Sequence, residues 1–214
     1  MKKLTFLFFI ATAATVMAQN DTTTSFESVY NACITLRDAV DRSDSADIML
    51  AATLLRNENV CTFGALECMD DEGDLDGHLI FDEDFADSLA HGRPVMLQAN
   101  SYNRELETVR GQTADGSILT KSCFAKANQS VKYRFEASGH QELAVVAEAG
   151  GLVTLKIHVT NNRGLNVRYD DRKDVSKGRP QRKASFDMPE GRNIVELEVI
   201  NTCNKDISFV VISN

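Results

Sequence analysis

The feature that most constrains the fold of this chain is an alternation of apolar and polar residues through its final hundred or so positions. The stretch from Ser130 to Glu136, which reads SVKYRFE, shows the pattern, and turn-forming residues separate it from similar stretches. A period of two is typical of strands with one buried face, and many short strands at regular spacing indicate an antiparallel β-sandwich. The expected strands cover residues 118–124, 130–136, 142–148, 152–159, 165–169, 184–187, 193–200 and 207–212.

The residues before this region follow the helical period of 3.6 instead. Thr24 and Glu27 form a capping-box pattern, and the apolar residues after them recur on one helical face. After a short polar turn, Ser43 or Asp44 can cap a second helix of the same kind. A third, short helix is expected to begin at the acidic residues 82–84. The predicted fold class is therefore α+β, with a helical lobe followed by an antiparallel β-sandwich of about eight strands.

The N-terminus has the layout of an export signal. Two lysines precede an apolar run that ends in small residues, with cleavage expected near Ala18. The run is too short to span a bilayer, which takes about 20 residues, and no later apolar stretch comes close to that length. We divide the chain into a signal peptide (1–18), an acidic, mainly helical lobe (19–118) and a β-sandwich domain (119–214), and we expect export to the periplasm or the cell exterior.

The two expected lobes differ in charge. Residues 19–118 hold 20 acidic and 6 basic residues, a net charge of −14, whereas residues 119–214 hold 11 acidic and 15 basic residues, a net charge of +4. The whole chain has a formal net charge of −8. Nucleic-acid binding rests on basic surfaces that neutralise phosphates. An exported chain with this balance is therefore not expected to bind nucleic acid.

Strand and turn motifs of the second lobe form a recognisable set. They are Tyr133-Arg-Phe135, Ala137-Ser-Gly139, Leu143-Ala-Val-Val146, Gly150-Gly151 and Phe186-Asp-Met-Pro-Glu-Gly191. From about residue 121 to residue 214 the chain resembles the bacterial pre-peptidase C-terminal domain, a small jelly-roll sandwich appended to many secreted enzymes. The resemblance implies that the expected sandwich is jelly-roll-like and that it is a non-catalytic accessory or binding domain. The family's Asp-rich segment is replaced here by residues 152–158, so its calcium site is not carried over.

An acidic stretch at residues 72–83 comes close to the spacing of a twelve-residue calcium loop. With Gly77 at the sixth position, carboxylates fall at the first, third, fifth and twelfth positions, where such loops place ligands. The candidate metal ligands are Glu72, Asp74, Asp76 and Glu83. Ile80 occupies the ninth position, where an oxygen ligand is usual, and a solvated acidic turn explains the same residues. Both interpretations stay open, and the sequence indicates no other cofactor.

The acidic lobe has a basic counterpart between Arg163 and Lys183. Guanidinium groups match the geometry of carboxylate, sulfate and phosphate, and the connections of a sandwich often bind ligands. The residues expected to contact an anionic ligand are Arg168, Arg172, Lys173, Arg179 and Arg182. Three interpretations stay open: a solvated loop, an anion-binding face, and docking against the acidic lobe within one molecule or between two.

The five cysteines all lie after the expected signal, so the exported chain would meet an oxidising compartment. We expect a disulfide between Cys123 and Cys203, because they lie in the first and penultimate segments of the expected sandwich. A second bridge between Cys61 and Cys68 is an alternative. Burial of all five as thiols is the other interpretation, and an odd number leaves at least one thiol unbridged within the molecule.

No catalytic motif stands out in the sequence. The histidines lack metal-binding spacing, and no serine lies in a G-x-S-x-G motif. The four histidines, His78, His91, His140 and His158, are each interpreted as a surface or structural residue. The leading hypothesis is an exported, non-catalytic binding or structural module for an anionic glycan or a protein surface. The alternative is a secreted hydrolase, or hydrolase accessory protein, that uses carboxylates in a cleft between the lobes.

Overall fold

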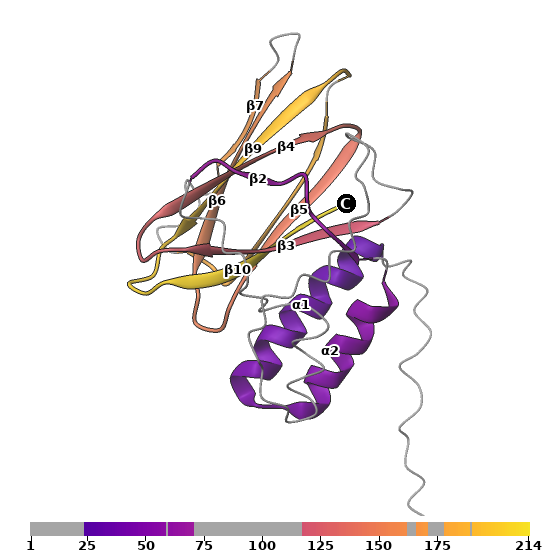
Figure 1. Ribbon diagram of the computed structural model, residues 1–214, viewed down its shortest axis with the longest axis vertical. Helices are drawn as coiled ribbons and strands as arrows, with labels where there is room; N and C mark the ends of the chain where they lie inside the picture. Colours follow the sequence, from indigo (N-terminus) through magenta and orange to yellow (C-terminus); the bar gives the residue numbers. More distant parts are fainter. Residues whose placement is uncertain (1–23, 59, 71–116, 162–165, 171–177, 189) are drawn as a thin grey trace, which may run out of the picture.

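The computed structural model describes residues 24–58, 60–70, 117–161, 166–170, 178–188 and 190–214 (Figure 1). Two helices come first, α1 (Ser25–Arg42) and α2 (Ser45–Asn57). Ten strands follow within these residues: β1 (Val60–Thr62), β2 (Glu67–Cys68), β3 (Ile118–Ala125), β4 (Ser130–Ala137), β5 (His140–Ala147), β6 (Val153–Asn161), β7 (Asn166–Asp170), β8 (Gln181–Asp187), β9 (Asn193–Asn201) and β10 (Ile207–Ser213). The α+β class and the eight strands predicted from the alternation are confirmed.

The strands form two five-stranded sheets. The first sheet has the order β1-β3-β10-β5-β8 and the second has the order β2-β4-β9-β6-β7. When the eight longer strands are numbered from β3, these orders become 1-8-3-6 and 2-7-4-5. Two interleaved Greek keys give this arrangement, so the sandwich is a jelly roll. The alternating residues of both sheets fill the space between them, with Tyr133, Leu197 and Phe209 among the fully buried side chains.

The helical hairpin covers the outer face of the first sheet (Figure 1). Helix α1 contacts β3, β5 and β10. The sheet residues beneath the hairpin are Ile118, Ala144, Val146, Val210 and Ile212. Strands β5 and β10 are thus buried on both faces, which explains why Leu143–Ala147 and Phe209–Ile212 read as continuous apolar runs rather than as alternation.

Both helices begin at caps that the sequence indicates. Thr24 Oγ1 accepts a hydrogen bond from Glu27 N at 3.3 Å, and Asp44 Oδ1 accepts from Ala46 N and Asp47 N. Ser43 instead ends α1 in the left-handed conformation, with φ of 56°. No helix among the described residues is both long and apolar enough to cross a membrane. The expected third helix lies outside the described residues.

The segment from 60 to 70 joins the sandwich, although no strand was predicted there from the sequence. Strand β1 pairs in parallel with β3, and β2 pairs with β4 in the other sheet. Between them, Phe63 and Leu66 enter the core, where the Phe63 ring packs edge-on against Phe135. Asp70 then accepts a hydrogen bond from Lys132 N at 2.8 Å. This segment therefore bridges the edges of the two sheets.

The outer face of the second sheet carries rows of alternating charge across its strands. One row pairs Lys132 with Glu198 and Glu198 with Lys156; the next runs from Glu67 through Arg134 to Glu196. Opposite charges thus face each other on neighbouring strands, which stabilises a sheet. Burial raises the pKa of Glu198, but the hydrogen bond and charge of Lys156, helped by Ser130 and Lys132, lower it overall below its ordinary value.

The predicted disulfide between Cys123 and Cys203 is wrong, because both side chains are thiols in the described structure. Cys123 lies opposite Phe209 in the middle of a β3–β10 pairing, whereas Cys203 lies in the turn before β10 begins. Cys203 Sγ instead accepts a hydrogen bond from Leu152 N at 3.1 Å. Cys68 is also a thiol, and it lies in the opposite sheet from Cys61.

Replacing Leu36 with alanine should lower the free energy of unfolding by about 2–5 kcal/mol, because it leaves a cavity under the hairpin. Leu36 is fully buried, whereas Leu50 on α2 is 51% exposed. Leu50→Ala is therefore the control and should change stability by about 0.5 kcal/mol or less. Urea denaturation measures both variants, and equal losses would show that the hairpin does not pack on the sheet as described.

The Glu198→Gln variant should melt at a lower temperature than the parent protein at pH 7, with a difference that shrinks as the pH falls toward 3. The lowered pKa means that the carboxylate stabilises the fold above its ordinary value of 4.5 and loses this effect as it protonates. Melting curves at several pH values measure this, with Glu58→Gln at the end of α2 as the control. A difference that stays constant with pH would contradict the assignment.

Candidate functional site

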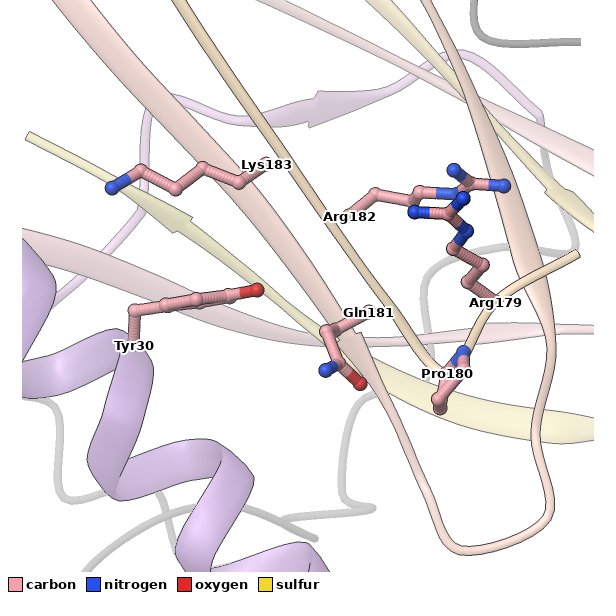
Figure 2. A pocket seen from close by; sticks show the side chains of 6 residues that line it. All are labelled: Tyr30, Arg179, Pro180, Gln181, Arg182 and Lys183. Atoms are coloured by element: carbon pink, nitrogen blue, oxygen red, sulfur yellow. The ribbon is translucent and has the colours of Figure 1, made fainter. Parts of the chain in front are cut away.

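A hollow of about 320 Å³ opens where the start of β8 meets α1 (Figure 2). It is lined by Tyr30, Arg179, Pro180, Gln181, Arg182 and Lys183. Two of these residues, Arg179 and Arg182, belong to the basic set proposed from the sequence. Tyr30 lies about 150 positions earlier in the chain, so its place here depends on the packing of α1 against the sheet.

The backbone around Arg179 crosses from one sheet to the other. Arg179 forms an isolated bridge with Val153 of the second sheet, with N–H···O distances of 2.8 and 3.0 Å, while Pro180 O accepts from Ala147 N in the first sheet. The crossing starts at Gly178, where a Cβ atom would collide with Thr202 Oγ1. A glycine is therefore required for this close approach. The exposed Arg179 side chain is held at the rim of the hollow by a fixed backbone.

Arg182 has a different environment from the one expected. The sequence placed it in a polar loop, but it lies on β8 and is 8% exposed. Its Nε donates to Val153 O at 3.3 Å, the same carbonyl that accepts from Arg179 N. Figure 2 shows the Arg179 and Arg182 side chains pointing toward one another. Arg182 therefore ties the two sheets together and brings its positive charge beside Arg179.

Lys183 points away from this pair, toward α1 (Figure 2). Its Nζ forms ion pairs with Glu27 of α1 and with Glu142 of β5, the latter at 3.4 Å. It also lies 5.1 Å from the centre of the Phe26 ring. Burial lowers the pKa of Lys183, but the hydrogen bond and charges of both carboxylates outweigh this and raise it above its ordinary value. The last residue of the basic run thus docks on the acidic lobe, as one of the three interpretations allowed.

The α1 side of the hollow supplies groups that can hydrogen-bond a ligand. Burial and the negative charge of Glu27 raise the pKa of Tyr30 above 10.0, against the charges of Lys183 and Arg37, so the phenol keeps its proton at neutral pH. Arg37 is buried and donates to Gln181 Oε1 at 2.6 Å, which holds that amide in place. Neither Tyr30 nor Gln181 was predicted from the sequence as a site residue.

Charge decides what this hollow can accept. The exposed guanidinium of Arg179 lies at its rim, and the buried guanidinium of Arg182 adds a second positive charge to the same hollow. Their planar forks suit the two oxygens of a carboxylate or sulfate. The opposite wall offers a protonated phenol and an amide, which suit hydroxyl groups. The arrangement therefore favours a small polar ligand that carries a negative charge.

The structure separates Arg168 from this hollow. Arg168 is exposed on the outer face of the second sheet, opposite His158. Arg172 and Lys173 lie outside the described residues, so the sequence-based prediction for them is untested. The predicted basic set is thus not one continuous face, because a sandwich places its two outer faces on opposite sides.

The candidate calcium ligands Glu72, Asp74, Asp76 and Glu83 also lie outside the described residues. Within the part of the chain that the structure describes, no group of three or more His, Cys, Asp or Glu residues is arranged to hold a metal ion. At the described boundary between helices and sandwich, Glu27 and Glu142 are engaged with Lys183. The alternative of a carboxylate site between the lobes therefore depends on residues beyond those described.

No protein-family model and no curated protein matches this sequence. Among solved structures, TmCBM61 in complex with β-1,4-galactotriose is 9% identical, with a TM-score of 0.30, over 45% of this chain and 81% of its own. The Yersinia pseudotuberculosis-derived mitogen is 9% identical, with a TM-score of 0.34, over 45% and 84%. PliG, a periplasmic inhibitor of g-type lysozyme from Salmonella Typhimurium, is 17% identical, with a TM-score of 0.28, over 50% and 98%. At these identities the likeness is one of fold alone.

Proposed function

We propose that this protein is an exported binding module and that the hollow between α1 and β8 holds the negatively charged group of an acidic glycan. The observation that supports this most is the convergence of Arg179 and Arg182 on one hollow with Tyr30 and Gln181. A volume of about 320 Å³ is at the lower end of ligand sites, which suits one or two sugar rings.

Each wall of the hollow has a part in the proposed recognition. Arg179, which is exposed and rigidly placed, forms the ion pair with a carboxylate or sulfate. The buried Arg182 adds charge and fixes the position of the crossing segment. The phenol of Tyr30 points across the hollow toward β8 and donates to a sugar hydroxyl (Figure 2). The binding energy comes from charge-assisted hydrogen bonds rather than from ring stacking.

Two further parts of the proposal come from the sequence. Export is supported by the two lysines and the apolar run before Ala18. Kinship with the pre-peptidase C-terminal domain is supported by the strand and turn motifs and is compatible with the jelly-roll strand order. Both point to a module that works outside the cytoplasm, where acidic glycans are accessible.

Calorimetric titration of the purified protein with trigalacturonate tests the proposal, with neutral galactotriose of the same length as the control ligand. We expect heat of binding with the carboxylated sugar and much weaker binding with the neutral one. Affinity should fall as salt is raised, because the ion pair at the rim is exposed to solvent. Equal binding of both sugars, or no binding of either, would contradict an anion site.

Arg179→Ala should weaken trigalacturonate binding about tenfold, the effect of losing about 1.4 kcal/mol from one charge-assisted contact. Arg192→Ala is the matched control, because Arg192 is 70% exposed, lies just before β9 and pairs with Glu136 of β4 in the second sheet. It should bind like the parent protein. Arg179→Lys should recover only part of the affinity, because lysine lacks the planar fork.

Equal affinities for Arg179→Ala and Arg192→Ala would place any binding elsewhere on the molecule. A melting curve of each variant separates lost binding from lost folding, since both arginines are exposed and neither substitution should lower the melting temperature appreciably.

A further inference from the structure

Three polar side chains form a hydrogen-bonded chain at the edge of the first sheet, beyond the hollow. His140 Nδ1 lies 2.7 Å from Asp187 Oδ1, and His140 Nε2 lies 3.1 Å from Ser185 Oγ. This hydrogen-bonded group could not be predicted from the sequence, because the three residues fall in two segments more than forty positions apart. Nothing in the proposed binding at the hollow uses them.

Strand pairing fixes this arrangement. His140 is directly opposite Asp187, and Glu142 is directly opposite Ser185, in an unbroken β5–β8 register. Residues two apart on a strand share a face, so Ser185 and Asp187 flank the same imidazole from one side of the sheet. The three side chains therefore do not depend on a mobile loop for their alignment.

The order of the groups matches that of a nucleophile, a base and an orienting carboxylate. When Asp187 accepts the proton on Nδ1, the neutral imidazole of His140 has its lone pair on Nε2, where it faces the hydroxyl of Ser185. The geometry points to Ser185 as a nucleophile, His140 as its general base and Asp187 as the residue that positions the base. We propose that this edge of the sheet hydrolyses short acyl esters.

The strand edge also provides a donor for the developing oxyanion. Met188 N donates a hydrogen bond to Gly139 O, and Ala147 N donates one to Pro180 O. In an antiparallel ladder, hydrogen-bonded and non-hydrogen-bonded pairs alternate, so these two bonds identify which β5–β8 pairs are hydrogen-bonded. Ser185 and Glu142, the residue opposite it on β5, form one of the pairs that do not exchange backbone hydrogen bonds. The N–H of Ser185 therefore points to the open side of β8, which is the edge strand of its sheet among the described residues. A backbone N–H at the nucleophile is a common oxyanion donor.

The reaction balances with these groups and water alone. Ser185 Oγ attacks the acyl carbon as its proton passes to His140 Nε2. The bond between the acyl carbon and the alcohol oxygen breaks, and the alcohol leaves with that proton. Water then attacks the acyl–serine while His140 accepts a proton from it, the carboxylic acid leaves, and Ser185 recovers its hydroxyl proton.

The exposure of the site defines the substrate class. His140 is 54% exposed and Asp187 is 90% exposed, so nothing among the described residues encloses a small substrate. An open strand edge suits an acyl group, such as an acetyl ester, that projects from a large or polymeric carrier. Access is direct and water for deacylation is abundant, whereas the polar, solvated surroundings weaken electrostatic catalysis. The expected turnover is therefore slow.

Hydrolysis of p-nitrophenyl acetate by the purified protein tests the proposal, with mass spectrometry of the peptide that contains Ser185 to detect the acetyl intermediate. Ser185→Ala and His140→Gln should each lower the rate by about 10²-fold, the usual contribution of an activated nucleophile and its base. Asp187→Asn should lower it by about tenfold and leave Ser185 able to acylate. All three side chains lie at the surface, so the variants should fold normally.

His158→Gln is the matched control, because His158 faces a carboxylate, Glu196, at 3.5 Å on the other outer face of the sandwich. It should hydrolyse the ester at the parent rate. If Ser185→Ala keeps the parent activity, or if no acetyl group is found on Ser185 during turnover, the proposal is wrong. Loss of sugar binding in Arg179→Ala with esterase activity retained would show that the two sites are independent.

Discussion

The burial of one sheet on both faces is the constraint on which the rest of the structure depends. Strands β5 and β10 have apolar side chains on both faces, one facing the second sheet and the other facing outward. The outward-facing apolar side chains would be exposed to water unless another element packed on them. The helical hairpin provides this cover, through the apolar stripe of α1. Removal of this much apolar surface from water is the dominant favourable term in such packing. The hairpin is therefore part of the core and not an appendage.

The polar residues of both candidate sites lie where the helical hairpin stops covering the first sheet. On the outer face of β5, Ala144 and Val146 pack beneath the hairpin, whereas His140 and Glu142 lie beyond it. Lys183 marks the boundary, with its ammonium group between Glu27 of α1 and Glu142. Both candidate sites then follow β8, because this strand lies at the margin of the sheet that the hairpin covers. The hollow lies at its beginning and the Ser185–His140–Asp187 chain at its end.

Much of the fold could be predicted from local pattern. The eight expected strands and the Thr24 and Asp44 caps follow from local signals, and the structure contains all of them. Strands β1 and β2 were missed, because elements of two or three residues have no measurable period. Cys123 and Cys203 were paired wrongly, because sequence places residues in segments but does not give the register that separates them.

The sequence by itself determined the α+β class, the antiparallel sandwich of about eight strands and the identity of Arg179 and Arg182 as residues of interest, since period and residue type are properties of short stretches. Tertiary structure alone decided that Arg168 lies apart from them, that Arg182 is buried and that Tyr30 completes the hollow. It also brought Ser185 and Asp187 to His140. These outcomes depend on strand order, register and helix docking, which are set by long-range burial of apolar surface rather than by any local pattern.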